Sequence, residues 1–288
     1  MDKTINQIDH IGIAHSDIFK NENNYKNIGF DLTELKPLMS IDSKNNSIEL
    51  GQYSQHFIFE KTYVELTGVL DSNKGSHIST FLEKFDGLHI LCFNTSNASK
   101  AAIKLSKIGI DVGKVQTASR VVNYGKKGIA KFKWFIIPKS IAPEGLICFV
   151  EHLTPELVFQ EKILSHKNLA NSLMEVKIYS ENLIQCCDNY SKILDMNYTS
   201  HSLGYQFSFS ENNLIILNYD SYKSEYPSEE PPSQSCLASF SIGVSDIGKT
   251  RNYLISKNIN FNYRNSKCSW IPSKVGGGAI IDFYQKDK

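Results

Sequence analysis

Two histidines and two glutamates of this chain follow one another in an order that would suit a metal site. His10 and His89 both lie in short apolar stretches, and each is followed in a later apolar stretch by a glutamate, Glu65 and Glu151 respectively. Imidazole nitrogens and carboxylate oxygens are ligands that Zn, Ni, Fe(II) and Mn accept in proteins. The order His, Glu, His, Glu on four predicted strands therefore indicates a set of ligands for one divalent cation.

The number of carboxylates in such a set decides its chemistry. Two histidines with one carboxylate favour Fe(II) and oxygen chemistry, whereas two histidines with two glutamates favour Lewis-acid isomerisation. In the second case Glu65 or Glu151 doubles as the catalytic base. Because side chains alternate between the two faces of a strand, the neighbouring residues Glu151 and His152 face opposite ways. The sequence leaves open which of the two faces the cavity.

Four further side chains are candidates for a substrate pocket around this metal site. Arg120 is a candidate for binding an anionic substrate, although an exposed charge on a strand is the more common role of such a residue. The others are histidines and a tryptophan that fit either the cavity wall or a purely structural position: His56, His152 and Trp134.

The elements that carry these residues form a repeat. A strand at residues 5–14 precedes a helix that begins after Ser16-Asp17, and three strands follow at 30–40, 46–59 and 61–70, which gives a β-α-β-β-β unit. The unit recurs from about residues 88, 174 and 238. Matching the copies pairs His10 with His89, Glu175 and approximately Ser239, and pairs Glu65 with Glu151, Asn218 and Asp282.

The repeat divides the chain into two halves. We predict an N-terminal domain over residues 1–153, a linker over 154–171 that is rich in Leu, Val and Phe, and a C-terminal domain over 172–288. The last two copies lack the histidines of the first two at the matched positions. The pattern therefore locates any metal chemistry in the N-terminal half.

A β-α-β-β-β module repeated four times, with His on a first strand and Glu on a last strand, resembles the vicinal oxygen chelate superfamily. The stretches Tyr63-Val64-Glu65-Leu66 and 151–158 resemble its glyoxalase-like domain branch. The resemblance implies an α+β fold in which two modules pair into one cupped mixed sheet, so that four modules form two cups. Two cups in one chain are compatible with a monomer or a homodimer.

The resemblance also implies a range of functions. The first is a divalent-metal-dependent enzyme of isomerase or lyase type that stabilises an enediolate of a small oxygen-rich substrate, with His10, Glu65, His89 and Glu151 as ligands. An extradiol-type dioxygenase is one alternative. A metal-free protein that binds a small molecule, like the resistance proteins of the superfamily, is the other.

The net charge, the apolar runs and the cysteines limit the kinds of partner that we expect for this chain. The net charge of +1 gives no electrostatic footprint for nucleic acid, and no apolar run reaches the roughly 18 residues that would span a membrane. The six cysteines are irregularly spaced, which argues against a disulfide framework. The beginning of the chain shows no apolar signal segment. We expect a cytoplasmic, bacterial protein whose partner is a small-molecule substrate.

Overall fold

The computed structural model describes residues 5–41 and 46–286, and these residues form four β-α-β-β-β modules. The predicted α+β class and the fourfold repeat are confirmed. The first module consists of β1 (Ile5–Ala14), α1 (Ile18–Ile28), β2 (Lys36–Ile41), β3 (Ser47–Ile58) and β4 (Tyr63–Val69). A short helix, α2 (Ser79–Leu82), leads to the second module: β5 (Gly87–Thr95), α3 (Ala98–Lys107), β6 (Gln116–Val122), β7 (Gly128–Ile136) and β8 (Leu146–His152).

The segment between the second and third modules holds α4 (Pro155–Val158) and a 3-10 turn, η1 (Glu161–Ile163). The third module consists of β9 (Ala170–Ser180), α5 (Leu183–Leu194), β10 (Thr199–His201), β11 (Gly204–Ser208) and β12 (Asn213–Leu217). Helix α6 (Tyr219–Glu225) leads to the fourth: β13 (Ser235–Val244), α7 (Ile247–Ser256), β14 (Asn262–Asn265), β15 (Cys268–Ile271) and β16 (Ile280–Gln285).

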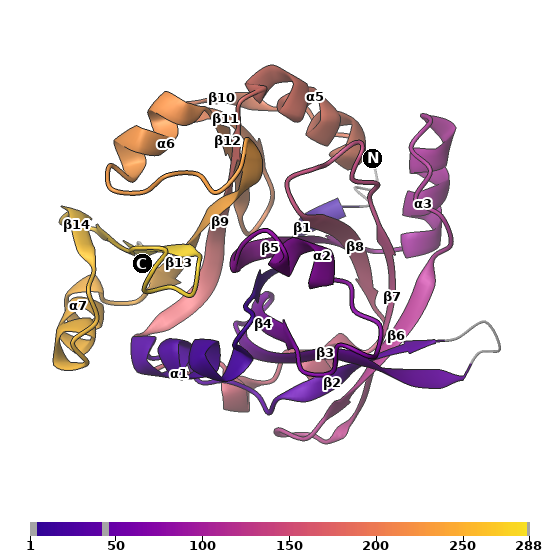
Figure 1. Ribbon diagram of the computed structural model, residues 1–288, viewed down its shortest axis with the longest axis horizontal. Coiled ribbons are helices and arrows are strands. Elements are labelled where there is room, and N and C mark those ends of the chain that lie inside the picture. Colours follow the sequence, from indigo (N-terminus) through magenta and orange to yellow (C-terminus); the bar gives the residue numbers. More distant parts are fainter. Residues whose placement is uncertain (1–4, 42–45, 287–288) are drawn as a thin grey trace.

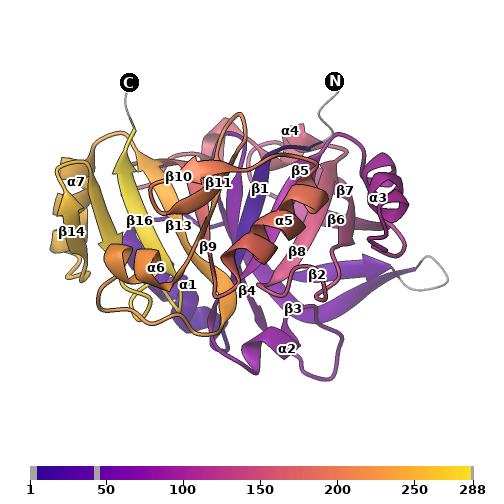
Figure 2. The same ribbon diagram turned by 90° about the horizontal axis from the view of Figure 1, so that it is seen from above.

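Each pair of modules builds one curved sheet of eight strands, with the order β2-β3-β4-β1-β5-β8-β7-β6 in the first sheet and β10-β11-β12-β9-β13-β16-β15-β14 in the second. We call the concave sides of these sheets the N-terminal cup and the C-terminal cup (Figures 1 and 2). The first strands of the two paired modules run antiparallel at the centre, β1 against β5 and β9 against β13. The edge strands β2 and β6 contact each other, which closes the N-terminal cup almost into a barrel.

The convex sides of both sheets and the helices that cover them share one apolar cluster. Ile11 and Phe93 of the first sheet belong to the same buried cluster as Ile178 and Phe240 of the second. Polar contacts join the halves as well, because the buried Asn212 amide accepts a hydrogen bond from the Ile8 backbone nitrogen and donates one to the Ile8 carbonyl oxygen, each at 2.9 Å. The two cups are therefore held back to back.

A β-bulge interrupts each central strand at the same place. The register shifts that contain Asp9 in β1 and His89 in β5 each insert one residue into the ladder, and the same irregularity contains Met174 in β9 and Ala238 in β13. Each of these residues lies eight positions before the N-cap of the helix that follows its strand. A bulge turns the following side chains to the other face. The four modules are thus aligned by their bulges.

Candidate functional site

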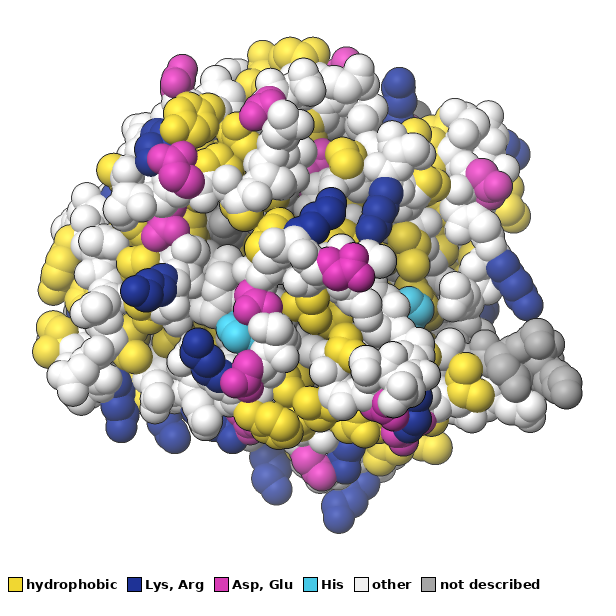
Figure 3. Space-filling view, viewed as in Figure 1, with side chains coloured by type: hydrophobic (Ala, Val, Ile, Leu, Met, Phe, Trp, Pro, Cys, Tyr) yellow, Lys and Arg dark blue, Asp and Glu magenta, His cyan; other side chains and the backbone are white. Residues whose placement is uncertain are grey.

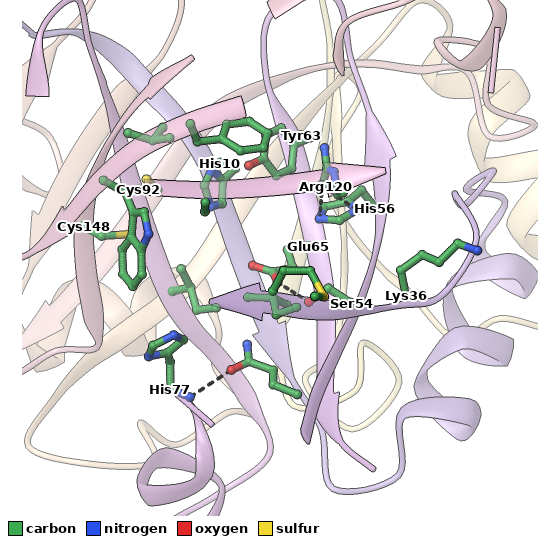
Figure 4. A pocket seen from close by; sticks show the side chains of 18 of the residues that line it. His10, Lys36, Ser54, His56, Tyr63, Glu65, His77, Cys92, Arg120 and Cys148 are labelled. Carbon is green, nitrogen blue, oxygen red and sulfur yellow. Dashed lines mark hydrogen bonds between the residues drawn. The ribbon is translucent and has the colours of Figure 1, made fainter. Parts of the chain in front are cut away.

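A cavity of about 160 Å³ lies inside the N-terminal cup, and every strand from β1 to β8 contributes to its wall (Figure 4). Its two halves differ in polarity. The first module supplies most of the polar side chains, among them His10, His56 and Glu65. The second module supplies a largely apolar wall, with Ile90, Phe132, Trp134, Leu146, Cys148 and Val150.

His10 is held by the carboxylate of the bulge residue beside it. The fully buried Asp9 lies 2.7 Å from His10 Nδ1 through Oδ1 and 3.0 Å from His152 Nε2 through Oδ2. Asn94 Nδ2 also donates to Asp9, at 3.3 Å. Burial opposes ionisation, but the charges and hydrogen bonds of His152 and His10 outweigh it and hold the pKa of Asp9 well below its usual range. Asp9 is therefore a carboxylate that only accepts hydrogen bonds.

The Asp9 contact fixes the proton on His10. Because Asp9 accepts, Nδ1 of His10 carries a hydrogen, and in the neutral imidazole Nε2 is the nitrogen with the lone pair. The imidazole is also fixed in orientation by stacking on Tyr63, with ring centroids 4.3 Å apart and planes 12° apart. A histidine oriented in this way by a buried carboxylate is the usual arrangement of a general base.

Glu65 faces the same cavity from β4. Its side chain is 7% exposed and accepts a hydrogen bond from the Ser54 hydroxyl on β3. Ser54 also contacts the Thr67 hydroxyl at 3.1 Å, and Thr67 accepts from Gln52 at 3.0 Å. A chain of neighbouring side chains thus fixes one Glu65 oxygen, while the carboxylate still borders the cavity (Figure 4).

Arg120 and His56 form the third polar group. Arg120 Nη1 lies 2.6 Å from His56 Nε2, and its guanidinium carbon lies 5.6 Å from the centre of the Tyr63 ring. Burial, and then the charges of Arg120 and His10, hold the pKa of His56 well below its usual range. His56 is therefore a neutral imidazole that accepts a hydrogen bond from the arginine.

His89, which the sequence pattern matched with His10, lies outside the cavity wall. Its ring contacts Phe81 and Phe85, with centroids 5.4 and 4.3 Å away, and its Nε2 lies 2.7 Å from the Phe85 carbonyl oxygen. His89 is the bulge residue of β5 and corresponds to Asp9. The residue that corresponds to His10 is therefore Ile90, which does line the cavity.

Glu151 also lies away from the cavity. Its Oε2 accepts a hydrogen bond from the Ala98 nitrogen at 2.9 Å, at the beginning of α3 on the outer side of the sheet. The question left open by the sequence is thus answered, because His152 lies on the inner side, where it contacts Asp9. In the ladder β5–β8 the residue that corresponds to Glu65 is Cys148, paired with Cys92 as Glu65 is paired with Gly12.

The structure therefore brings together two of the four predicted ligands, His10 and Glu65. The corresponding positions of the second module hold Ile90 and Cys148, and the pKa of the neighbouring Cys92 thiol is raised by burial and by Cys148. Over residues 5–41 and 46–286 no group of three or more His, Cys, Asp or Glu side chains could hold a metal ion. These residues do not fit the four-ligand site that the repeat predicted.

Three of the pocket candidates line the cavity, namely His56, Arg120 and Trp134. His152 does not line it and instead contacts Asp9. Asp9 carries no mark in the alternating pattern of its strand. The signal that identifies it is its distance to the helix cap: counting eight residues back from each N-cap aligns Asp9 with His89, and His10 with Ile90.

Comparison with known proteins identifies the family. A model of the glyoxalase-like domain matches residues 8–194. The chain belongs to the glyoxalase-like domain family. The resemblance to the vicinal oxygen chelate superfamily is thereby confirmed. No curated protein matches this glyoxalase-like protein by sequence.

Solved structures share the fold over the whole chain. A hypothetical protein from Staphylococcus aureus aligns with a TM-score of 0.65 and 15% identity, over 97% of this chain and 99% of that one. A mutant of 4-hydroxymandelate synthase from Streptomyces coelicolor aligns with a TM-score of 0.58 and 11% identity, over 99% and 93%. At these identities the likeness concerns the fold.

The surface of this glyoxalase-like protein shows no field of one sign on the side seen in Figure 3, where acidic and basic side chains are interspersed. In the part of the chain that the structure describes, no helix is long and apolar enough to cross a membrane.

Proposed function

We propose that this glyoxalase-like protein is an enzyme of isomerase or lyase type that moves a proton within a small molecule bound in the N-terminal cup. The observation that carries the proposal is the pair Asp9–His10, with Asp9 on Nδ1 of the imidazole and Nε2 directed to a cavity. The volume of about 160 Å³ is comparable to engineered cavities of about 150 Å³ that admit benzene. A compound with one ring or a short chain is therefore the expected size.

The chemical step follows from the tautomer of His10. Nε2 takes a proton from a carbon next to a carbonyl group, the C–H electron pair becomes a C=C bond, and the carbonyl π pair moves to the oxygen. Asp9 offsets the positive charge that His10 then carries. Return of the proton from Nε2 to the same carbon restores the substrate. In an α-hydroxy carbonyl compound the hydroxyl proton passes to the new oxyanion, the electron pair left on the first oxygen forms the new C=O bond, and the C=C pair takes the proton from Nε2 at the former carbonyl carbon, which gives the isomer with all atoms and electrons conserved.

This step uses no metal ion. Members of the superfamily with a complete ligand set have a cation available to stabilise the oxyanion. In this chain the second module presents Ile90 and Cys148 at the matched positions. Proton transfer in this cup therefore relies on the side chains of the chain itself.

Hydrogen exchange tests the proposal directly. The purified protein is incubated in D₂O with a panel of small keto acids, hydroxy ketones and aldehydes, and loss of the signal of the proton next to the carbonyl is followed by NMR. We expect exchange above the buffer rate for at least one compound. His10→Gln should abolish it, and Asp9→Asn should reduce it by about 100-fold or more, as when the orienting carboxylate of a catalytic histidine is replaced. Wild-type protein that exchanges nothing in the panel would contradict the proposal.

A metal-free binding protein is the second candidate, and the apolar half of the cavity favours it. The wall built by Ile90, Leu146 and Val150 provides burial for an apolar ligand without any reaction. The same experiment separates the two functions. A compound that raises the unfolding temperature but shows no His10-dependent exchange would favour binding alone.

A further inference from the structure

Arg120 is a cation of the N-terminal cup, and the side chains that it contacts are neutral. Its side chain extends from β6 to His56 on β3, where Nη1 donates to Nε2 at 2.6 Å. The other ring nitrogen of His56 lies 3.4 Å from the Thr33 hydroxyl. The guanidinium also lies 5.6 and 5.8 Å from the ring centres of Tyr63 and Phe132. These contacts hold the group in place without neutralising it.

The guanidinium keeps one buried nitrogen without a partner. Arg120 Nη2 is shielded from solvent and makes no hydrogen bond. Among the described residues no carboxylate oxygen lies within 4.0 Å of the Arg120 nitrogens. A buried donor without a partner costs about 1–3 kcal/mol, and more when it is charged. The guanidinium therefore has a buried donor that is available to a ligand.

The chemistry of the missing partner follows from the guanidinium. Its planar pair of donors matches the two oxygens of a carboxylate, and such charge-assisted pairs are stronger than neutral hydrogen bonds. The cavity beyond Arg120 is apolar on the side of Cys92 and Cys148, which lie across the cup from Arg120 (Figure 4). An anion with an apolar body fits both features.

We propose that Arg120 is the carboxylate-binding residue of the N-terminal cup and that the ligand is a small carboxylic acid with an aromatic or branched apolar body. The inference rests on the proposed function in that it names the substrate class of the same cup. The two groups are neighbours: Tyr63 stacks on His10 at 4.3 Å and faces the Arg120 guanidinium carbon at 5.6 Å. His10 and Arg120 therefore border the same tyrosine ring and line the same cavity.

Binding of simple probes tests this assignment without any need for turnover. Benzoate, phenylacetate and isobutyrate are compared with benzamide, benzyl alcohol and isobutyramide, which keep the shape and remove the charge. Each is added up to about 10 mM, a range that detects millimolar dissociation constants. Thermal unfolding and isothermal titration calorimetry give the readout. We expect at least one acid to raise the unfolding temperature and to bind about 10-fold or more tightly than its neutral counterpart.

Variants of the arginine assign the effect to this residue. Arg120→Gln should weaken binding of the acid by about 10- to 100-fold, while Arg120→Lys, which keeps the charge and loses the paired donors, should retain part of it. Lys131→Gln is the matched control, because Lys131 is an exposed cation on the neighbouring strand and lies outside the cavity wall. It should bind like the wild type.

Two results would overturn the inference. One is that none of the acids binds better than its neutral counterpart. The other is that Arg120→Gln binds an acid as tightly as the wild type. Both are distinct from failure of the proposed function, because acid binding without hydrogen exchange would keep the anion site and remove the proton transfer. Hydrogen exchange of neutral ketones without binding of any acid would keep the proton transfer and remove the anion site.

Discussion

The two cups of this chain are built alike and use their polar residues in opposite ways. In the C-terminal cup, Lys177 of the third module corresponds to Gly12 of the first. Asp282 of the fourth module has the place that Glu65 has in the first module and Cys148 in the second. Lys177 is 1% exposed, and its Nζ lies 2.7 Å from Asp282 Oδ2 and 3.5 Å from Glu175 Oε2. The ammonium thus lies among carboxylates of the chain itself.

The remaining charge of the C-terminal cup is paired as well. Arg264 lies 3.0 Å from Asp282 Oδ1 and 3.1 Å from Glu225 Oε2. The Tyr226 hydroxyl, just after α6, donates to Asp282 Oδ2 at 2.6 Å. Arg264 therefore has two carboxylate partners, where Arg120 of the N-terminal cup has a neutral histidine. One cup satisfies its charges internally, and the other leaves a charge for a ligand.

The difference between the cups predicts that removing a carboxylate lowers the free energy of unfolding most when the carboxylate belongs to the C-terminal cup. Asp282→Asn leaves Lys177 and Arg264 without their shared counter-ion, and breaking a buried pair in this way costs about 3–5 kcal/mol. The free energy of unfolding in urea measures the loss. Glu65→Gln is the control in the other cup and should cost less than about 1.5 kcal/mol, because the amide oxygen still accepts from Ser54. Equal losses of unfolding free energy in the two variants would show that the two cups do not differ in this way.

The two arginines should respond in opposite senses. Arg264→Gln removes a cation with two carboxylate partners and should lower the free energy of unfolding by about 2–4 kcal/mol. Arg120→Gln removes a cation without a carboxylate partner and should leave stability within about 1 kcal/mol of the wild type or raise it. Urea unfolding of both variants, without ligand, checks this. A large loss in Arg120→Gln would show that the N-terminal charge is structural.

Acidification should weaken the wild type through Asp282 as well as Asp9. The pKa of Asp282 is lowered: burial raises it, but Lys177 and Arg264 outweigh burial. A carboxyl group with a lower pKa in the folded state stabilises the protein above its unfolded pKa of about 4, and this contribution is lost as the pH falls through the folded value. Unfolding measured from pH 7 to pH 2 should show this loss. The slope should be shallower in Asp282→Asn.

Metal removal should have the smallest effect. Prolonged treatment with a chelator, followed by dialysis, should change the unfolding temperature by less than about 1 °C, since the matched positions of the N-terminal cup hold Ile90 and Cys148. Metal analysis should find less than about a tenth of an equivalent bound. A stoichiometric metal that is lost in His10→Ala would restore the ligand set predicted from the sequence.

The repeat and the fold could be predicted because each rests on patterns of many residues. Alternating apolar positions, helix caps such as Asp17 and Asn97, and the glycine after α1 all recur in the sequence and mark the elements. The face of the sheet on which a single side chain lies changes when the register of its strand shifts by one residue. A bulge at His89 reverses the alternation after it, and nothing in an alternating pattern marks the inserted residue.

The candidate site was predictable in part for the same reason. His10, Glu65, His56, Arg120 and Trp134 do line one cavity, because their strands have an unambiguous apolar side. The hydrogen bond from His152 to Asp9 joins residues 143 positions apart and depends on the curvature of the whole sheet. Contacts of that kind have no local signature.

The contact between Asn212 and Ile8 has a consequence for the synthesis of this protein. Domains generally form as they leave the ribosome, N-terminal part first. The strands of the N-terminal cup are all available once residue 152 has emerged, yet both backbone groups of Ile8, next to Asp9, obtain their partners from a residue made 60 positions later. The nascent chain thus carries a nearly finished cup in which Ile8 of the first strand lacks these two partners until Asn212 has been translated.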